Sequence, residues 1–414
     1  MLEQIEGSLG VAKAVALCRP GVVCAYPISP QTHIVENVGK FVKNGTLKDC
    51  DFLNVESEFS AISVAIGSEV GGVRTYTATA SQGLLYMTEG VYSASGLGLP
   101  IVMTVASRAI GGPINIWNDH SDSLSQRDSG WLQLFCESNQ DAVDTHIMAF
   151  KIAEEVGLPV MVCMDGFVLT HAFERLDIPS QETVDKFLPE YQPREYLTPK
   201  EPVSIGAMVG PEAFTEVRFL QQRKMAKALK VIEKVTKEYR DLTGSKSGGL
   251  LDCYNCENAD LKLVIMGSTV GTAKDEIDRL KAEGINVGII SLKSFRPFPY
   301  EAMAKAIGDT KKVICLERAF SFGARGIVCP EVKRAMEGKN CDVKTVVAGL
   351  GGRPIYGTTI RGIVKDALAD KFTEEFTWFD VNADVLNSYT DKTEGVTFKN
   401  GPIAQSVLEN SVKD

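Results

Sequence analysis

The sequence predicts an α/β protein built from two doubly wound domains. Strand-length apolar runs alternate with helix-length segments over residues 21–167, and the same alternation returns over residues 260–370. The chain, at 414 residues, is also too long for one ordinary hydrophobic core. Strands and helices that alternate in this way form parallel sheets with helices on both faces. Ligands of such sheets bind outside the carboxyl ends of the strands.

The first domain is expected to span residues 1–245. Its first 20 residues are predicted to form a helix, and the apolar run at 21–26, bounded by Gly and Pro, a buried strand. The later elements follow in order: a helix at 31–44, a strand at 52–57, a helix at 58–70, a strand at 73–80, a helix at 82–95, a strand at 99–107, a polar loop at 108–130, and a strand, helix and strand ending near residue 167.

The remaining segments differ in composition. The Pro-rich residues 168–212 predict an irregular linker or an arm that wraps a neighbour. Residues 213–243 predict a long helix with an apolar stripe suited to packing or to a subunit contact. The second domain is expected at 258–370, with strands at 262–267, 287–291, 312–317 and 343–349. The tail, 371–414, is expected to pack on a partner, and its aromatic cluster at 376–379 to dock on a partner or a domain.

Composition narrows the classes of function. The net charge of -9 disfavours nucleic acid and anionic membranes as partners. The amino terminus has no basic and apolar leader pattern, and no apolar run is long enough to span a bilayer, so a cytoplasmic location is expected. The ten cysteines are scattered through apolar runs, as is typical of a reducing compartment. The single pair Cys253-Tyr-Asn-Cys256 lacks the second pair that a structural zinc site needs, so we interpret it as structural or adventitious.

Polar side chains follow four successive strands of the first domain. Ser29 follows the first strand, Glu58 the second, Ser81-Gln82-Gly83 the third and Arg108 the fourth. Each has an ordinary structural explanation: Ser29 and Ser81 can start helices, Glu58 can belong to a capping box, and Arg108 can form a surface ion pair. Their joint position at one edge of a parallel sheet favours a ligand site.

Two weaker patterns are interpreted as structural. The turn Met266-Gly-Ser-Thr-Val-Gly271 carries two glycines but no G-x-G-x-x-G fingerprint, which argues against a nicotinamide-dependent dehydrogenase. Asp119, His120 and Asp122 form an incomplete ligand set, so a polar turn is favoured over a metal site, and no metal is expected in this chain.

Several motifs resemble the α subunit of 2-oxoacid:ferredoxin oxidoreductases, and the resemblance covers nearly the whole chain. The motifs are Tyr26-Pro-Ile-Ser-Pro-Gln-Thr, Val55-Glu-Ser-Glu-Phe-Ser-Ala, Thr79-Ala-Ser-Gln-Gly-Leu, Ser107-Arg-Ala, the stretch Asn118–Trp131, Phe295-Arg-Pro-Phe-Pro299 and Gly349-Leu-Gly-Gly-Arg353. The loop Gly112-Pro-Ile-Asn-Ile-Trp-Asn-Asp-His120 looks most like that of the pyruvate-specific members.

The resemblance implies a subunit of a pyruvate:ferredoxin oxidoreductase, which converts pyruvate and coenzyme A reversibly to acetyl-CoA, CO₂ and reduced ferredoxin. It implies a domain that binds the pyrimidine of thiamine diphosphate, followed by a domain like the transketolase C-terminal domain. The sequence has no Gly-Asp-Gly motif and no four-cysteine cluster motif. Mg²⁺, the diphosphate site and the [4Fe-4S] clusters are therefore expected on partner chains: a β subunit, a γ subunit and a ferredoxin-like δ subunit, with ferredoxin as acceptor.

The resemblance also implies roles for individual residues. Glu58 matches the catalytic glutamate that hydrogen-bonds the pyrimidine ring, and Pro30, Ser81 and Gln82 are expected to help bind the cofactor. Arg108 matches the clamp for the substrate carboxylate, because a guanidinium can hold a carboxylate by two parallel hydrogen bonds.

Ser29 is expected beside the substrate, where many relatives have Thr, and it counts against oxalate as the substrate. The segment 109–122 looks like the family's active-site loop, with members Gly111, Gly112, Asp119, His120 and Asp122.

Two alternatives stay open within this resemblance. The substrate could be a branched-chain or aryl 2-oxoacid or 2-oxoglutarate, since pocket size is not visible in the sequence. The chain could also be a non-catalytic assembly subunit, although Glu58 and Arg108 argue against this. The number of partner chains, the direction of the reaction and the electron acceptor are not determined by the sequence.

Overall fold

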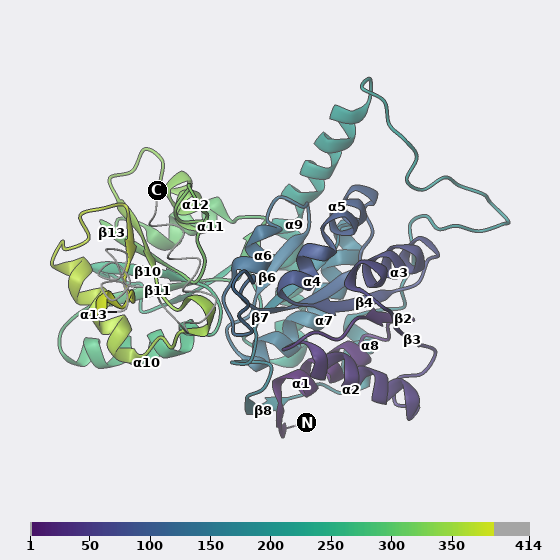
Figure 1. The fold of residues 1–414 in the computed structure, drawn as a ribbon, viewed down its shortest axis with the longest axis horizontal. Helices are drawn as coiled ribbons and strands as arrows, with labels where there is room; N and C mark the ends of the chain where they lie inside the picture. Colours follow the sequence, from purple (N-terminus) through teal and green to yellow (C-terminus); the bar gives the residue numbers. More distant parts are fainter. Residues whose placement is uncertain (1, 385–414) are drawn as a thin grey trace, which may run out of the picture.

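The computed structural model describes residues 2–384 as two α/β units side by side (Figure 1). The first unit is built on a seven-stranded sheet with the order β12-β6-β7-β5-β4-β2-β3. All neighbours are parallel except β12, which runs antiparallel to β6 at the edge. The strands are β2 (Val22–Ala25), β3 (Asp51–Asn54), β4 (Thr75–Thr79), β5 (Val102–Ser107), β6 (Leu132–Phe135), β7 (Val160–Asp165) and β12 (Ser294–Arg296).

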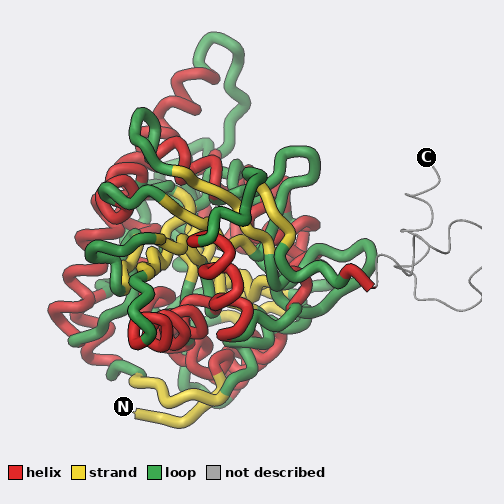
Figure 2. The backbone as a smooth tube through the Cα atoms, turned by 90° about the vertical axis from the view of Figure 1, so that its left-hand side faces the viewer, coloured by secondary structure: helices red, strands yellow, loops and turns green. Residues whose placement is uncertain are grey.

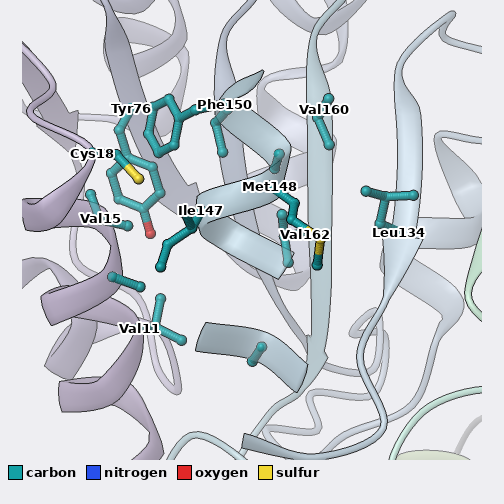
Figure 3. Packing of buried hydrophobic residues seen from close by; sticks show 14 of the residues in the cluster. Val11, Val15, Cys18, Tyr76, Leu134, Ile147, Met148, Phe150, Val160 and Val162 are labelled. Carbon is teal, nitrogen blue, oxygen red and sulfur yellow. The ribbon is translucent and has the colours of Figure 1, made fainter. Parts of the chain in front are cut away.

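Helices cover both faces of this sheet, as the alternating pattern predicts. One face packs on α1, α2 and α7, and the other on α3, α4 and α5. Figure 3 shows the first of these cores, where Val11 and Val15 of α1 and Ile147 and Phe150 of α7 meet Tyr76 of β4. The helices are α1 (Gly7–Leu17), α2 (Thr32–Lys43), α3 (Glu58–Val70), α4 (Ser81–Tyr86), α5 (Thr88–Leu97), α6 (Ser121–Ser125) and α7 (Asn139–Val156).

The predicted helix over the first 20 residues is wrong at its start. Residues Leu2–Glu6 form strand β1, which pairs antiparallel with β8 (Phe173–Asp177), and the helix α1 begins only at Gly7. Gly7 is required there because a Cβ would lie 2.1 Å from the Leu169 carbonyl oxygen. The strand depends on a partner about 170 residues away, which local periodicity does not show.

The Pro-rich segment is more ordered than predicted. It contains β8 and the helix α8 (Gln181–Phe187) before an extended stretch, residues 188–213, that projects from the body together with the first turns of α9 (Phe214–Thr243) (Figures 1 and 2). The predicted stripe on α9 packs on α7 through Ile232, Val235 and Tyr239, which are buried. The end of the stripe, Leu242, is exposed.

The second unit has a six-stranded sheet with the order β15-β14-β13-β10-β11-β9, parallel except for β9. Its strands are β9 (Leu251–Tyr254), β10 (Leu261–Ile265), β11 (Val287–Leu292), β13 (Lys312–Glu317), β14 (Asp342–Val347) and β15 (Phe376–Trp378). Its helices are α10 (Thr269–Ala282), α11 (Tyr300–Ile307), α12 (Cys329–Ala335) and α13 (Gly357–Leu368).

The aromatic cluster at 376–379 docks on this chain, because β15 adds to the edge of the second sheet beside β14. The first part of the tail thus packs on the second unit, whereas its later part, residues 385–414, lies outside the described residues.

One of the hydrophobic cores extends across both units, because it joins Phe135 of β6 and Phe295 of β12 to Ile290 of β11 and Val313 of β13. Phe135 of β6 meets Phe295 of β12 edge to face at 6.5 Å between ring centroids, and both are buried. The Phe295-Arg-Pro-Phe-Pro299 motif thus contributes strand β12 to the first sheet, whereas the strands before and after it in the chain belong to the second sheet. Among the residues that the structure describes, no helix is both long and apolar enough to cross a membrane.

Candidate active site

The four polar groups singled out from the sequence lie at one crevice of the first sheet. β2 has β3 on one side and β4 on the other, so the strand order reverses there. Ser29 follows β2, Glu58 begins α3 after β3, Ser81 follows β4 and Arg108 follows β5. The crevice outside the carboxyl ends at such a switch point is where open α/β sheets bind their ligands.

Glu58 occupies the first turn of α3 but is not the residue that caps it. The Ser57 hydroxyl accepts the backbone N–H of Ser60 at 3.2 Å and fulfils that role. Glu58 is only 8% exposed, and within residues 2–384 no hydrogen bond or ion pair engages its carboxyl group. A carboxyl that has no partner in the described part of the chain is suited to a hydrogen-bonding ligand that the chain itself does not supply.

The space beside Glu58 depends on Gly83 of α4. A Cβ at this position would lie 2.7 Å from Oε1 of Glu58 and 2.5 Å from Oγ1 of Thr79. The Thr79 hydroxyl is itself buried and unpartnered in the described part of the chain. Sequence reasoning included Gly83 only as part of a helix start, whereas the structure shows that it makes room for the glutamate.

Arg108 joins the other predicted residues into one cluster. Its guanidinium donates to the Ser29 carbonyl oxygen at 2.8 Å, to Oε1 of Gln82 at 3.2 Å and to the Asn115 carbonyl oxygen at 3.3 Å. Burial lowers the pKa of Arg108, while the negative charges of Asp122 and Glu58 oppose this shift. Arg108 therefore remains the cation of a partly desolvated crevice that also contains Glu58.

Asp122 connects the ends of β4 and β5. Its Oδ2 accepts the backbone N–H groups of Ser81 at 2.8 Å and of Arg108 at 2.9 Å, and its Oδ1 accepts that of Ser123 at 2.6 Å. Burial raises the pKa of Asp122 to about 6, partly offset by these three hydrogen bonds. Ser81 has a backbone φ of +49°, which residues other than Gly rarely adopt. Its hydroxyl donates to the Ala109 carbonyl oxygen at 2.6 Å.

The predicted active-site loop divides into two parts. Gly111 lies against Gln82, whose Nε2 would be 2.0 Å from a Cβ at position 111, and Gly112 has a φ of +115°. Asp119 and His120 instead contact the second unit. Asp119 accepts the Gly351 backbone N–H at 3.1 Å, and the His120 backbone N–H donates to the Arg318 carbonyl oxygen at 3.0 Å.

Sequence reasoning missed a buried charged network that joins the loop to the second unit. Asp165, at the end of β7, accepts from Nε2 of His120 at 2.8 Å, from Nη1 of Arg318 at 3.0 Å and from the Ser268 backbone N–H at 2.9 Å. Burial acts to raise the pKa of Asp165, but the charges of His120 and Arg318 outweigh it and the pKa is lowered. Asp165 ends β7 and Arg318 follows β13, so the rule that binding residues lie at the carboxyl ends of parallel strands could have indicated both.

The glycines of the Gly349-Leu-Gly-Gly-Arg353 motif pack against the predicted active-site loop, residues 109–122. A Cβ at Gly351, which has a φ of +57°, would lie 2.6 Å from Nδ2 of Asn115, and one at Gly352 would lie 2.3 Å from the Cβ of Trp117. Nδ2 of Asn115 also donates to the Gly351 carbonyl oxygen at 3.1 Å. The second unit therefore holds the loop whose Asn115 carbonyl contacts Arg108.

Known proteins match this arrangement over nearly the whole chain. Residues 13–237 match the family described as pyruvate flavodoxin/ferredoxin oxidoreductase, thiamine diP-bdg. Residues 259–360 match pyruvate:ferredoxin oxidoreductase core domain II.

Two solved structures share the fold. A 2-oxoglutarate:ferredoxin oxidoreductase from Magnetococcus marinus has 21% identity and a TM-score of 0.66, with 89% of this chain and 65% of that chain covered. A split gene transketolase has 14% identity and a TM-score of 0.53, with 89% and 99% covered.

Curated relatives are similar in sequence as well. The pyruvate synthase subunit PorA of Methanosarcina barkeri is 44% identical over 87% of this chain and 91% of its own length. The same-named subunit of Methanocaldococcus jannaschii is 46% identical over 87% and 93%. The ketoisovalerate oxidoreductase subunit VorA of Pyrococcus horikoshii is 38% identical over 91% and 96%. The chain belongs to the pyruvate:ferredoxin oxidoreductase family, as its motifs indicated.

Proposed function

We propose that this chain is the α subunit of a pyruvate:ferredoxin oxidoreductase, active only together with partner chains. The observation that carries the proposal is the unengaged carboxyl of the largely buried Glu58 beside the Arg108 cation at the switch point. The family match to a thiamine-diphosphate-binding domain and the relatives named pyruvate synthase subunit support the same conclusion.

Glu58 would hold the aminopyrimidine ring of thiamine diphosphate. Bound in this family of sites, the cofactor supplies a carbon nucleophile that attacks the 2-oxoacid carbonyl and accepts the electrons left by decarboxylation. The residues fit the ring, because Glu58 offers a carboxyl that no other described side chain uses and Gly83 leaves space beside it. The task of Glu58 is to share a proton with the ring nitrogen, which a partly desolvated carboxyl does well. Pro30, Ser81 and Gln82 would help to bind the cofactor: Pro30 follows Ser29, Gln82 accepts a hydrogen bond from Arg108, and the Ser81 hydroxyl donates to the Ala109 carbonyl oxygen.

Arg108 would bind the substrate carboxylate. Three of its five N–H groups already donate to Ser29, Gln82 and Asn115, which fixes the plane of the guanidinium. A fixed guanidinium can orient the oxoacid and cancel its charge in a partly desolvated crevice. Ser29 offers its backbone carbonyl to Arg108, which leaves its hydroxyl available for the substrate.

A partner chain would complete the site. The aromatic rings of Tyr26, Phe59 and Tyr86 are all at least one third exposed, and they lie on the elements that border the crevice. We assign the diphosphate and Mg²⁺ site to a β subunit, and the iron–sulfur clusters to partner chains, among them a ferredoxin-like δ subunit, that deliver electrons to ferredoxin. The same proposal includes a γ subunit, coenzyme A as the acyl acceptor and a cytoplasmic location. It also includes two domains, at residues 1–245 and 258–370.

A different 2-oxoacid is the alternative that a specific finding favours. The VorA relatives are named for ketoisovalerate and reach 38% identity, close to the PorA relatives. Branched or aryl substrates would use Glu58 and Arg108 in the same way and differ only in the side-chain pocket.

The test is an anaerobic assay of the native complex. The complex is purified with its bound partners, and coenzyme A-dependent reduction of a low-potential dye is measured over a panel of 2-oxoacids. Activity with pyruvate, together with bound thiamine diphosphate and iron, supports the proposal. Activity with only a bulkier oxoacid replaces the substrate and keeps the mechanism. Absence of activity in a complex that contains both cofactors overturns the proposal in favour of an assembly subunit.

A further inference from the structure

Two of the chain's four histidines meet at a site that the proposed reaction does not use. Glu6 ends β1, His33 is the second residue of α2, and His171 lies in the turn between β7 and β8. The three elements are distant in sequence and come together beside the β1–β8 ribbon. One ligand atom from each residue lies within 4.8 Å of the other two. His33 is exposed, while Glu6 and His171 are half-buried.

The geometry of the cluster is that of a partly assembled ligand set. Nδ1 of His33 lies 2.7 Å from Oε1 of Glu6, and the His33 and His171 rings lie 4.6 Å apart between centroids. An ion of tetrahedral geometry with bonds of about 2 Å brings its ligand atoms to roughly 3.3 Å from one another. The His33–Glu6 pair, at 2.7 Å, lies about 0.6 Å closer than this spacing, and the other ligand atoms lie within 4.8 Å, so side-chain rotations would bring the set to the spacing of an ion.

His171 is oriented for such a role by an outer hydrogen bond. Its Nδ1 hydrogen-bonds the buried Thr170 hydroxyl at 2.7 Å, and this hydroxyl accepts the Phe167 backbone N–H at 2.8 Å. Histidines that bind metals commonly engage their second ring nitrogen with a neighbouring polar group, which fixes the orientation of the ring.

We propose that Glu6, His33 and His171 bind a divalent transition metal, with Zn²⁺ as the best fit and water as the fourth ligand. Two imidazoles and one carboxylate suit zinc, whereas Mg²⁺ and Ca²⁺ prefer oxygen ligands alone. The ion replaces the proton between His33 and Glu6. It ties the amino-terminal strand β1 to α2 and to the turn after β7.

The structural alternative is an ion pair between His33 and Glu6 with a stacked His171. Exposed ion pairs of this kind contribute little to stability. Binding of an ion by the full-length chain therefore separates the two explanations, and neither outcome depends on catalytic activity.

The experiment uses the full-length chain after removal of bound metal with a chelator. Zn²⁺ binding is measured by calorimetry, and Co²⁺ is used as a spectroscopic probe of coordination. The expected result is one tightly bound ion per chain, a higher Tm, and tetrahedral Co²⁺ bands without the sulfur-to-cobalt charge-transfer absorption of a thiolate site. A double variant Cys253→Ser, Cys256→Ser is the control for the thiol pair and should bind the ion unchanged.

The ligand variants decide the assignment. His33→Ala and His171→Ala should each weaken binding by more than the roughly 10–100-fold that loss of an outer hydrogen-bond partner costs. Glu6→Gln removes a ligand with little change in shape, and it keeps the test valid if an alanine variant folds poorly. Binding that persists in these variants, or wild-type affinity no better than that of His33→Ala, overturns the proposal.

Discussion

Gly83→Ala should separate the catalytic role of Glu58 from the stability of the fold. An added Cβ would lie 2.7 Å from Oε1 of Glu58 and 2.5 Å from Oγ1 of Thr79, whereas ordinary contacts begin at 3.4 Å. Both atoms belong to side chains, so they can yield without backbone movement, and the Glu58 carboxyl must shift by about 0.7 Å. Misplacement of a catalytic group by about 1 Å can cost about 100-fold in rate, so we expect kcat to fall by about 10–100-fold.

The cost in stability should be small by comparison. Overpacking costs about 1–3 kcal/mol, and replacing Gly by Ala inside a helix returns about 1 kcal/mol. Gly67→Ala is the matched control, because Gly67 lies on the same helix as Glu58, is exposed and has open space at its Cβ position. This control should keep full activity and be slightly more stable.

The assay is coenzyme A-dependent dye reduction with pyruvate in the assembled complex, together with titration of thiamine diphosphate and thermal unfolding. We expect Gly83→Ala to lose turnover in a folded complex while Gly67→Ala does not. A Gly83→Ala enzyme within twofold of wild-type kcat would refute the reasoning that Gly83 positions Glu58. An equal loss in both variants would show that any substitution near these helices is harmful, and it would refute the reasoning as well.

The other predictions concern the charged groups. Glu58→Gln should lower turnover by about two orders of magnitude or more, the range for loss of an acid–base group, and near-normal steady-state turnover would remove Glu58 from the mechanism. Arg108→Ala should raise the KM for the oxoacid by about 10–100-fold, since a charged hydrogen bond contributes about 1.5–3 kcal/mol, and leave thiamine binding intact; an unchanged KM would exclude the clamp. Asp122→Asn should cost about 1–3 kcal/mol in urea unfolding at low pH, because both oxygens of the protonated carboxyl keep acceptor capacity for the backbone N–H groups, whereas the amide nitrogen of Asn has none. Burial raises the pKa of Asp122 to about 6, from 3.8. Its contribution to the free energy of unfolding is therefore full below pH 4 and falls by about 3 kcal/mol as the pH rises through 6. The wild type should lose its advantage over the variant in that range, and a constant difference would contradict this.

The sequence by itself determined the local elements and the residues at their ends. Apolar runs between Gly and Pro are sufficient to predict buried strands such as β2 and β5, since burial of such runs depends mainly on their own composition. The rule that parallel sheets bind ligands at their carboxyl ends then selected Ser29, Glu58 and Arg108, which the structure brings to one crevice.

Only the tertiary structure decided the contacts between distant segments. β1 is a strand because of its partner β8, and β12 joins the first sheet although it lies within the second unit in sequence. The assignment of Asp119 and His120 to the active-site loop did not show that both contact the second unit, Asp119 through Gly351 and His120 through Arg318, or that His120 pairs with Asp165 of β7. These contacts join residues that are 45 to more than 200 positions apart, and a periodic pattern within one segment carries no information about them.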